Sequence, residues 1–129
     1  MKRLMIFVIS FYIGAVNAAE ETYLCVEDQA TGFALEADKW TLKDFNPDGK
    51  FIFKISAQGA GSFYEFGENP PEEPTCKDAG LFYDCEDRFG RQLKFNRGLN
   101  RFAVVHFMPY LWEDKTGNNW LALGTCSKI

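Results

Sequence analysis

The segment DFNPDGK resembles the first half of an EF-hand calcium loop. Asp44, Asn46 and Asp48 occupy the first, third and fifth positions of such a loop, and a glycine follows at the sixth. An EF-hand also needs a bidentate glutamate at its twelfth position, where this chain has Ile55. The sequence Asn-Pro-Asp-Gly at residues 46–49 is more typical of a hairpin turn, because proline presets φ and glycine tolerates a positive φ. We therefore predict a turn here, no metal site and no cofactor.

His106 is the single histidine of the chain and lies in the apolar run RFAVVHFMPY. A histidine in such a run is more often a core or rim residue with one hydrogen bond than a catalytic base. Nucleophilic catalysis would need a serine or cysteine beside it and an orienting acid. Ser62, in GAGSF, fits neither G-x-S-x-G nor G-x-G-x-x-G, because Tyr64 replaces the last glycine. We predict no catalytic residue and keep a small hydrolase using His106 as an alternative.

Adjacent carboxylates are plentiful, as in Glu72-Glu73 and Glu86-Asp87. A glycosidase needs two carboxylates that face each other across a cleft, which a sequence cannot show. Most such pairs lie on the solvated surface. A hydrolase that uses a carboxylate pair instead of His106 is therefore kept only as an alternative.

Residues 88–102, RFGRQLKFNRGLNRF, contain five cations and no acid. Guanidinium groups bind carboxylate or phosphate with forked hydrogen bonds, so the segment predicts a site for an anionic ligand or an acidic protein surface. The alternative is exposed ion pairing with acidic neighbours, worth about 0–1 kcal/mol per pair. The candidate ligand-binding residues are Arg88, Arg91, Lys94, Arg97, Arg101 and His106.

The four cysteines of the chain all follow residue 18. An even number in an exported protein indicates disulfides, whereas a zinc site usually contains pairs such as C-x-x-C, which are absent from the sequence. Three pairings are possible. We favour one that closes a local loop and one that ties the first strand to the last: Cys76–Cys85 and Cys25–Cys126.

Residues 1–18 have the composition of a secretory signal peptide, with Lys2 and Arg3 before an apolar run and small residues at the end. The apolar run from Leu4 to Val16 is shorter than the roughly 17–25 residues that span a bilayer. We expect a periplasmic or secreted protein that does not span the membrane. Its single domain would comprise residues 19–129.

Removal of Lys2 and Arg3 would change the formal net charge from −4 to −6. Such an acidic chain is a poor candidate for general nucleic-acid binding. Thirteen phenylalanines, five tyrosines and three tryptophans are many for this length. They could fill a small barrel or sandwich, or some could line a ligand cavity.

Short runs rich in aromatic and β-branched residues recur between turn signals, and no run has helical periodicity with caps. The fold class we predict is all-β, an antiparallel meander that forms a small barrel or sandwich. In RQLKFNR, Arg91, Leu93, Phe95 and Arg97 share one face and the intervening polar residues the other. The predicted strands are 22–27, 32–36, 39–44, 51–56, 62–66, 81–86, 91–97, 101–108 and 119–126.

The segments CVEDQATGF, FNRGLNRF and GTCSKI resemble parts of uncharacterised small exported proteins of Gram-negative bacteria, a resemblance that carries no function. Lipocalin-like calycins would have G-x-W near the first strand, and Trp40 follows Asp38-Lys39 instead. Periplasmic lysozyme inhibitors are similar in size, disulfides and architecture only, which does not fix function.

The first hypothesis is a non-enzymatic binding module of the cell envelope. It would be a monomer that binds an anionic ligand or a protein partner through residues 88–102, which we call the Arg-rich hairpin. The alternatives are the small hydrolase, a structural or assembly protein that forms a stable oligomer, and an inhibitor of an envelope-attacking enzyme.

Overall fold

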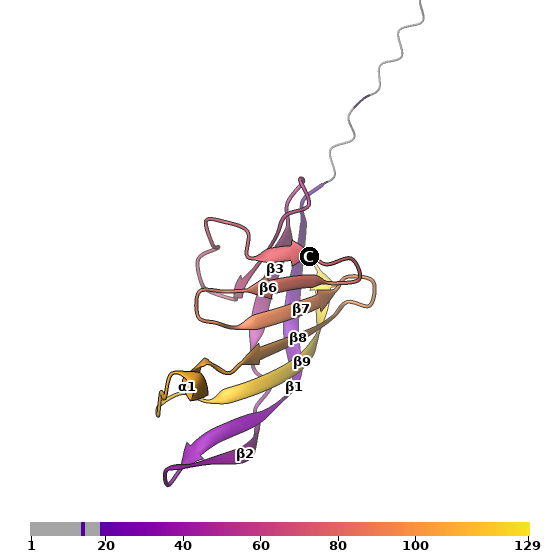
Figure 1. Ribbon diagram of the computed structural model, residues 1–129. Coiled ribbons are helices and arrows are strands. Elements are labelled where there is room, and N and C mark those ends of the chain that lie inside the picture. The colour runs from indigo at the N-terminus through magenta and orange to yellow at the C-terminus, as the bar shows by residue number, and fades with distance from the viewer. Residues whose placement is uncertain (1–13, 15–18) are drawn as a thin grey trace, which may run out of the picture.

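The computed structural model describes Gly14 and residues 19–129 of the chain (Figure 1). Apart from Gly14, the predicted signal peptide lies outside the described residues. The described chain forms a closed barrel of eight antiparallel strands, with β2 as an additional strand, which confirms the all-β prediction and selects a barrel over a sandwich. The elements are β1 (Glu21–Glu36), β2 (Lys39–Phe45), β3 (Lys50–Ile55), β4 (Gly61–Glu65), β5 (Cys76–Asp78), β6 (Tyr83–Glu86), β7 (Gln92–Asn96), β8 (Arg101–His106), α1 (Met108–Leu111) and β9 (Asn119–Lys128).

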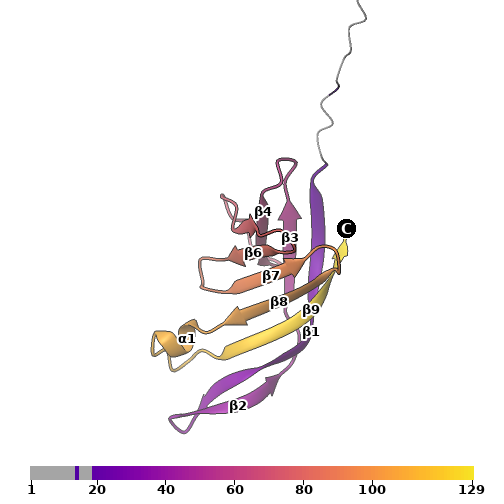
Figure 2. The same cartoon turned by 45° about the vertical axis from the view of Figure 1, so that its right-hand side comes forward.

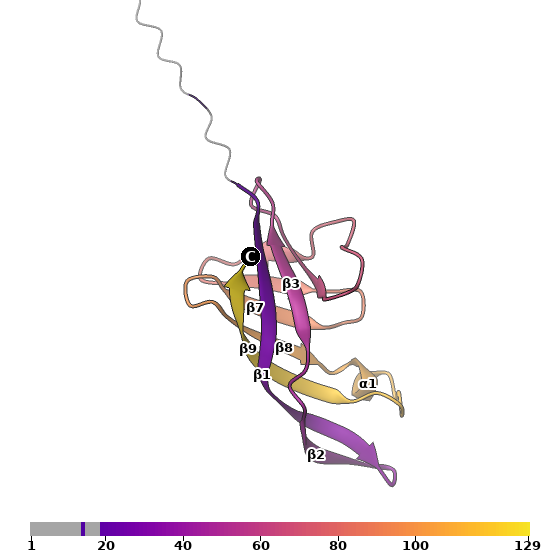
Figure 3. The same ribbon diagram turned by 180° about the vertical axis from the view of Figure 1, so that it is seen from behind.

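The long strand β1 closes the barrel because it has strand partners on both edges. Residues 21–26 pair with β3 on one edge, while β9 runs along the other. From Ala30 onwards the first edge pairs with β2 instead, so that β1 and β2 form a hairpin that projects beyond the barrel (Figure 2, Figure 3). The register with β9 shifts between Glu27 and Gln29, a β-bulge that redirects β1 where it leaves the barrel.

The Asn-Pro-Asp-Gly segment at residues 46–49 does not form the predicted hairpin turn. Within the described residues β2 and β3 do not pair with each other, and both pair antiparallel with the same edge of β1, one after the other. The segment therefore links two strands that run in the same direction, with a local bond from the Asp48 amide to the Asn46 carbonyl (2.9 Å). Turn residues indicate a bend but not which strand becomes the partner, so the prediction was wrong.

Three elements differ from those expected. The strands predicted at 22–27 and 32–36 are one strand, β1, because Ala30 to Gly32 stay extended between two partners. The three-residue β5 was not predicted, because it directly follows a proline-rich acidic loop and is too short to show a pattern. The strand predicted at 101–108 ends at His106 and the chain turns into the four-residue α1, with Pro109 in its first turn. No helix among the described residues has the length and apolarity to cross a membrane.

Aromatic side chains fill the barrel interior. The rings of Phe53 and Phe95 are fully buried with centroids 4.6 Å apart, and the ring of Tyr23 lies 5.1 Å from that of Phe95. Burial of one such ring stabilises the fold by about 1.5–3 kcal/mol. The inward face predicted for β7 is confirmed, because Leu93 and Phe95 are buried whereas Lys94 is exposed.

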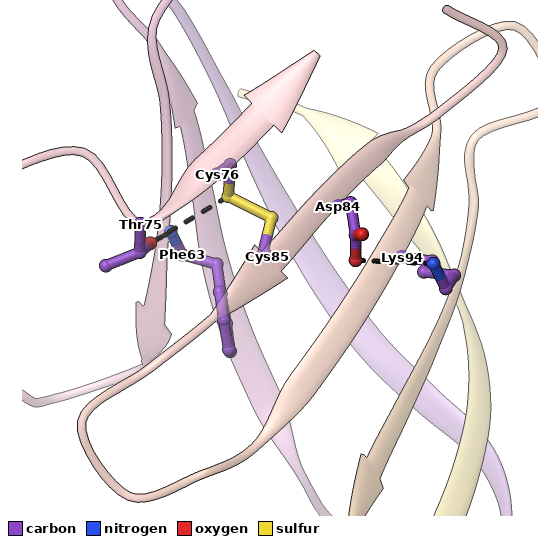
Figure 4. The surroundings of a disulfide bond; sticks show 6 residues. All are labelled: Phe63, Thr75, Cys76, Asp84, Cys85 and Lys94. Carbon is purple, nitrogen blue, oxygen red and sulfur yellow. Dashed lines mark hydrogen bonds and ion pairs between the residues drawn. A yellow bond between two sulfur atoms is a disulfide. The ribbon is translucent and has the colours of Figure 1, made fainter. Parts of the chain in front are cut away.

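Both disulfides join residues that lie directly opposite each other on paired strands. Figure 4 shows the one between β5 and β6, beside which the Phe63 amide donates to the Thr75 hydroxyl (3.0 Å). Two disulfides indicate an oxidising compartment. The observed pairs are the favoured ones: Cys25–Cys126 and Cys76–Cys85.

Candidate binding cleft

A cleft of about 640 Å³ opens at the end of the barrel where β1 extends into its hairpin. Its walls come from β1, β2, β3, β4, β8 and β9, from the segments that follow β2, β4 and β6, and from the residue before β9. The charged residues that line it are Glu27, Asp48, Glu65, Glu68 and Arg91. The aromatic residues that line it include Phe45, Phe51, Phe89 and Trp120, with His106 beside them.

Arg91 is held at the floor of this cleft by carboxylates. Its Nε donates to Asp87 (2.5 Å) and its Nη1 to Glu65 (2.8 Å), while Nη2 lies 3.7 Å from Glu68. Its guanidinium also lies 5.2 Å from the centroid of the Phe89 ring. Burial lowers the pKa of Arg91, but its hydrogen bonds to Glu65 and Asp87 outweigh this and raise the pKa above its ordinary value.

The turn between β6 and β7 explains why Arg91 points inward. Arg91 continues the inward row of β7, two residues before Leu93. Asp87 organises the turn, because its Oδ1 accepts from the amides of Phe89 (3.0 Å) and Arg91 (2.9 Å). The same carboxylate thus shapes the loop through one oxygen and binds the guanidinium through the other.

Glu27 presents a buried carboxylate to the cleft. It follows Tyr23 and Cys25 on the inward row of β1 and is only 8% exposed. Its Oε2 accepts from the Gly49 amide (3.1 Å), and its own amide donates to the Gly49 carbonyl (3.0 Å). A Cβ at position 49 would lie 2.2 Å from the Glu27 carboxylate, so this approach requires glycine.

The protonation of Glu27 is shifted by its surroundings. Burial raises the pKa of the Glu27 carboxyl, and the hydrogen bond from Gly49 opposes that rise. The negative charges of Asp48 and Glu65 raise the pKa further. No cation forms an ion pair with Glu27 among residues 19–129 of the structure.

His106 lies at the rim of the same cleft. Its Nε2 is 3.1 Å from the Phe89 carbonyl, which can only accept, so the ring donates from Nε2. Its ring packs edge-on against Trp120, with centroids 5.9 Å apart. None of the described cysteines is free. In the part of the chain that the structure describes, no acid is hydrogen-bonded to His106.

The other predicted ligand-binding cations do not gather at this cleft. Lys94 points outward and pairs with Asp84 (3.3 Å), as Figure 4 shows. Arg97, at the opposite end of β7, pairs with Glu21 (2.7 Å). Arg88 and Arg101 form no ion pair among the described residues. Of the six candidates, only Arg91 and His106 line the cleft, within the part of the chain that the structure describes.

The sequence-based prediction missed most of the residues that line the cleft. One signal was present for Glu27, because a charged residue on the apolar row of β1 after Tyr23 and Cys25 is unusual. Nothing comparable marked Glu65 or Trp120, which enter the cleft only through strand pairing.

The cleft carries four carboxylates and one guanidinium in its lining, so its electrostatic character is acidic. In the described part of the chain no group of three or more histidine, cysteine or acidic side chains is arranged to hold a metal ion. The arrangement can therefore bind a ligand through distributed charge and aromatic contacts. Comparison of the chain with protein-family models, curated proteins and solved structures finds no match.

Proposed function

We propose that this protein is an exported, non-enzymatic binding module of the cell envelope and that the cleft at the open end of its barrel is the ligand site. The observation that carries the proposal is the convergence of buried charge and aromatic rings in one cleft of about 640 Å³. Ligand sites are concave, largely preformed and furnished with a few oriented polar groups. The disulfides and the predicted signal peptide support an exported location.

The ion pairs favour the cleft over the Arg-rich hairpin as the binding site. Arg91, Lys94 and Arg97 are each engaged by a carboxylate, which is the alternative that the charge pattern left open. An anion site would have to rely on Arg88 and Arg101. Replacement of these two arginines by glutamine tests that version of the proposal, because it should abolish any interaction made through the hairpin and spare one made through the cleft.

A pair of matched variants tests the cleft itself. Trp120 lines the cleft, whereas its neighbour Leu121 points outward and is 37% exposed. Native mass spectrometry of the protein purified from a periplasm should reveal a ligand or partner bound to the wild type and to L121A, but lost from W120A. Equal retention by both variants would place the binding site elsewhere.

A second candidate function is supported by one observation. The buried Glu27 with its raised pKa lies in the same cleft as Asp48 and Glu65, and a glycosidase pairs a protonated carboxyl with an ionised one. Release of reducing sugar from cell-wall oligosaccharides that is abolished in E27Q would establish this activity. Turnover unaffected by E27Q, or no turnover, would leave the binding module as the better proposal.

A further inference from the structure

The charge of the cleft is not balanced by its own residues. Four carboxylates of the lining face a single guanidinium, and Asp87 beneath it is a fifth acid. Glu27 is more than nine-tenths buried and accepts one backbone hydrogen bond, with no cation paired to it among the described residues. A buried carboxylate without a counter-charge is costly, so a ligand that supplies a positive charge gains more here than at the surface.

Arg91 does not make the cleft a receptor for anions. Its Nε and Nη1 already donate to Asp87 and Glu65 at 2.5 and 2.8 Å. An incoming anion would have to bind the remaining Nη donors beside Glu68, which lies 3.7 Å from Nη2, and would then lie among the carboxylates. The side chain of Arg91 therefore serves to hold the acids in position.

The aromatic lining selects the form of the cation. Rings of Phe45, Phe89 and Trp120 share the cleft with the carboxylates. An alkyl chain packs against such rings, and an ammonium group near a ring face gains a cation–π attraction. A bare metal ion would gain nothing from these rings, and the acids of the described chain are too dispersed to coordinate one.

We infer that the ligand of this cleft is a protonated amine carried on an alkyl chain, as in a lysine side chain of a protein partner or a free diamine. The inference rests on the proposed function and names the chemical class of the ligand. The ammonium group approaches Glu27 and Glu65, and the alkyl chain lies along Trp120 and Phe89. Glu27, Asp48, Glu65, Glu68, Arg91 and His106 are the titratable groups around this position.

Protonation of Glu27 competes with the ammonium group. Because the carboxyl must be ionised to attract a cation, the affinity should rise as pH increases through the pKa of Glu27 and then become constant. Glu27 accounts for that part of the pH dependence of affinity which the wild type shows and E27Q does not.

The test uses 1,5-diaminopentane and N-acetyl-lysine-methylamide as probes, followed by NMR shifts of the Trp120 indole and the Gly49 amide. Glutarate and N-acetyl-(ε-acetyl)lysine-methylamide are controls of matched length without the positive charge. We expect the amines to bind with a Kd on the order of 1 mM, weakening with added salt, and the controls not to bind. E27Q and E65Q should each weaken binding by about fivefold or more, while D84N, which removes an acid outside the cleft, should not.

The outcomes separate the two levels of the proposal. Tighter binding of the lysine derivative than of the diamine identifies a protein side chain as the source, and the reverse identifies a free amine. Shifts at Trp120 with glutarate but not with the amines would overturn the ligand class and leave the cleft as a binding site. No shift at Trp120 or Gly49 with any probe would overturn the ligand class, and together with equal retention by W120A and L121A it would overturn the proposed function.

Discussion

The side chains of Asp87 and Arg91 form an ion pair in which they are only 7% and 9% exposed. Few charged side chains are so deeply buried unless they are paired, and here the pair lies between the aromatic core and the cleft. It joins the loop before β7 to the end of β4, because Glu65 binds the same guanidinium. The pair thus couples the stability of the barrel to the shape of the cleft.

Removal of the Asp87 charge should destabilise the protein strongly. In D87N an oxygen remains to accept from the turn amides, but Arg91 loses its buried counter-charge. We expect the free energy of unfolding in urea to fall by about 3 kcal/mol, the lower end of the range for a broken buried pair, since Glu65 still binds Arg91. The control D84N breaks the half-exposed Lys94 pair and should cost less than about 1 kcal/mol. Equal losses in the two variants would contradict this assignment.

Replacement of Glu27 by glutamine should change the pH dependence of stability. Because the pKa of Glu27 is raised by burial in the folded state, its contribution to stability is complete below the pKa of the unfolded chain and is lost as pH rises through the folded-state pKa. E27Q does not titrate and so should be more stable than the wild type at pH 7 and gain nothing at pH 3. Urea unfolding at both pH values measures the difference. A larger advantage of E27Q at pH 3 than at pH 7 would show that the sign is wrong.

The two disulfides should contribute unequally. Cys25 and Cys126 are separated by 101 residues and Cys76 and Cys85 by 9. Because loop-closure entropy grows with loop length, replacement of the first pair by serines should cost about 5 kcal/mol and of the second about 3 kcal/mol. Thermal unfolding of both double variants without reductant tests the order. Less loss from the long-range pair would argue against the entropic explanation.

Gly124 should not tolerate even alanine. A Cβ there would lie 2.1 Å from the Val26 carbonyl oxygen and 2.4 Å from the ring of Phe102. The paired strands β1 and β9, which we call the β1–β9 seam, would therefore have to move apart. We expect G124A to lose about 3 kcal/mol of unfolding free energy. The control G98A should lose less than about 1 kcal/mol, because the nearest atom to its new methyl group is an Asn96 side-chain oxygen at 3.4 Å.

Local patterns predicted those features of the fold that depend on neighbouring residues. The alternation in RQLKFNR predicted the inward row of β7, and the positions of the cysteines in the first and last strands favoured the observed pairing. The hairpin of β1 with β2 fits the predicted meander, but the partner of β3 was not predictable, because β3 pairs with residues 21–26 of β1 and not with β2, the strand before it. The length of β1 was also not predicted, since Ala30 to Gly32 stay extended because they pair with β2 on one edge and with β9 on the other.

The binding cleft was harder to predict than the fold. Arg91 and His106 were selected for their residue types, and both line the cleft. Their role changed in the structure, because Arg91 is held by Asp87, an acidic neighbour in the sequence, and by Glu65 of β4, which the cationic run gave no reason to place beside it. Acidic residues from separate strands meet only when the barrel closes, so no spacing in the sequence could reveal them.

The pairing of β1 with β9 also affects how fast the barrel can fold. The seam joins segments about a hundred residues apart, so contacts with high sequence separation must form before the barrel is complete. Folding dominated by such contacts is slow, and until the seam closes the edges of β1 and β9 are free to pair with other chains. The Cys25–Cys126 bond sits on this seam, and once oxidised it turns a distant encounter into a local one. Oxidised chains should therefore refold faster and aggregate less than reduced chains, which gives an early oxidation step a kinetic value beyond its effect on stability.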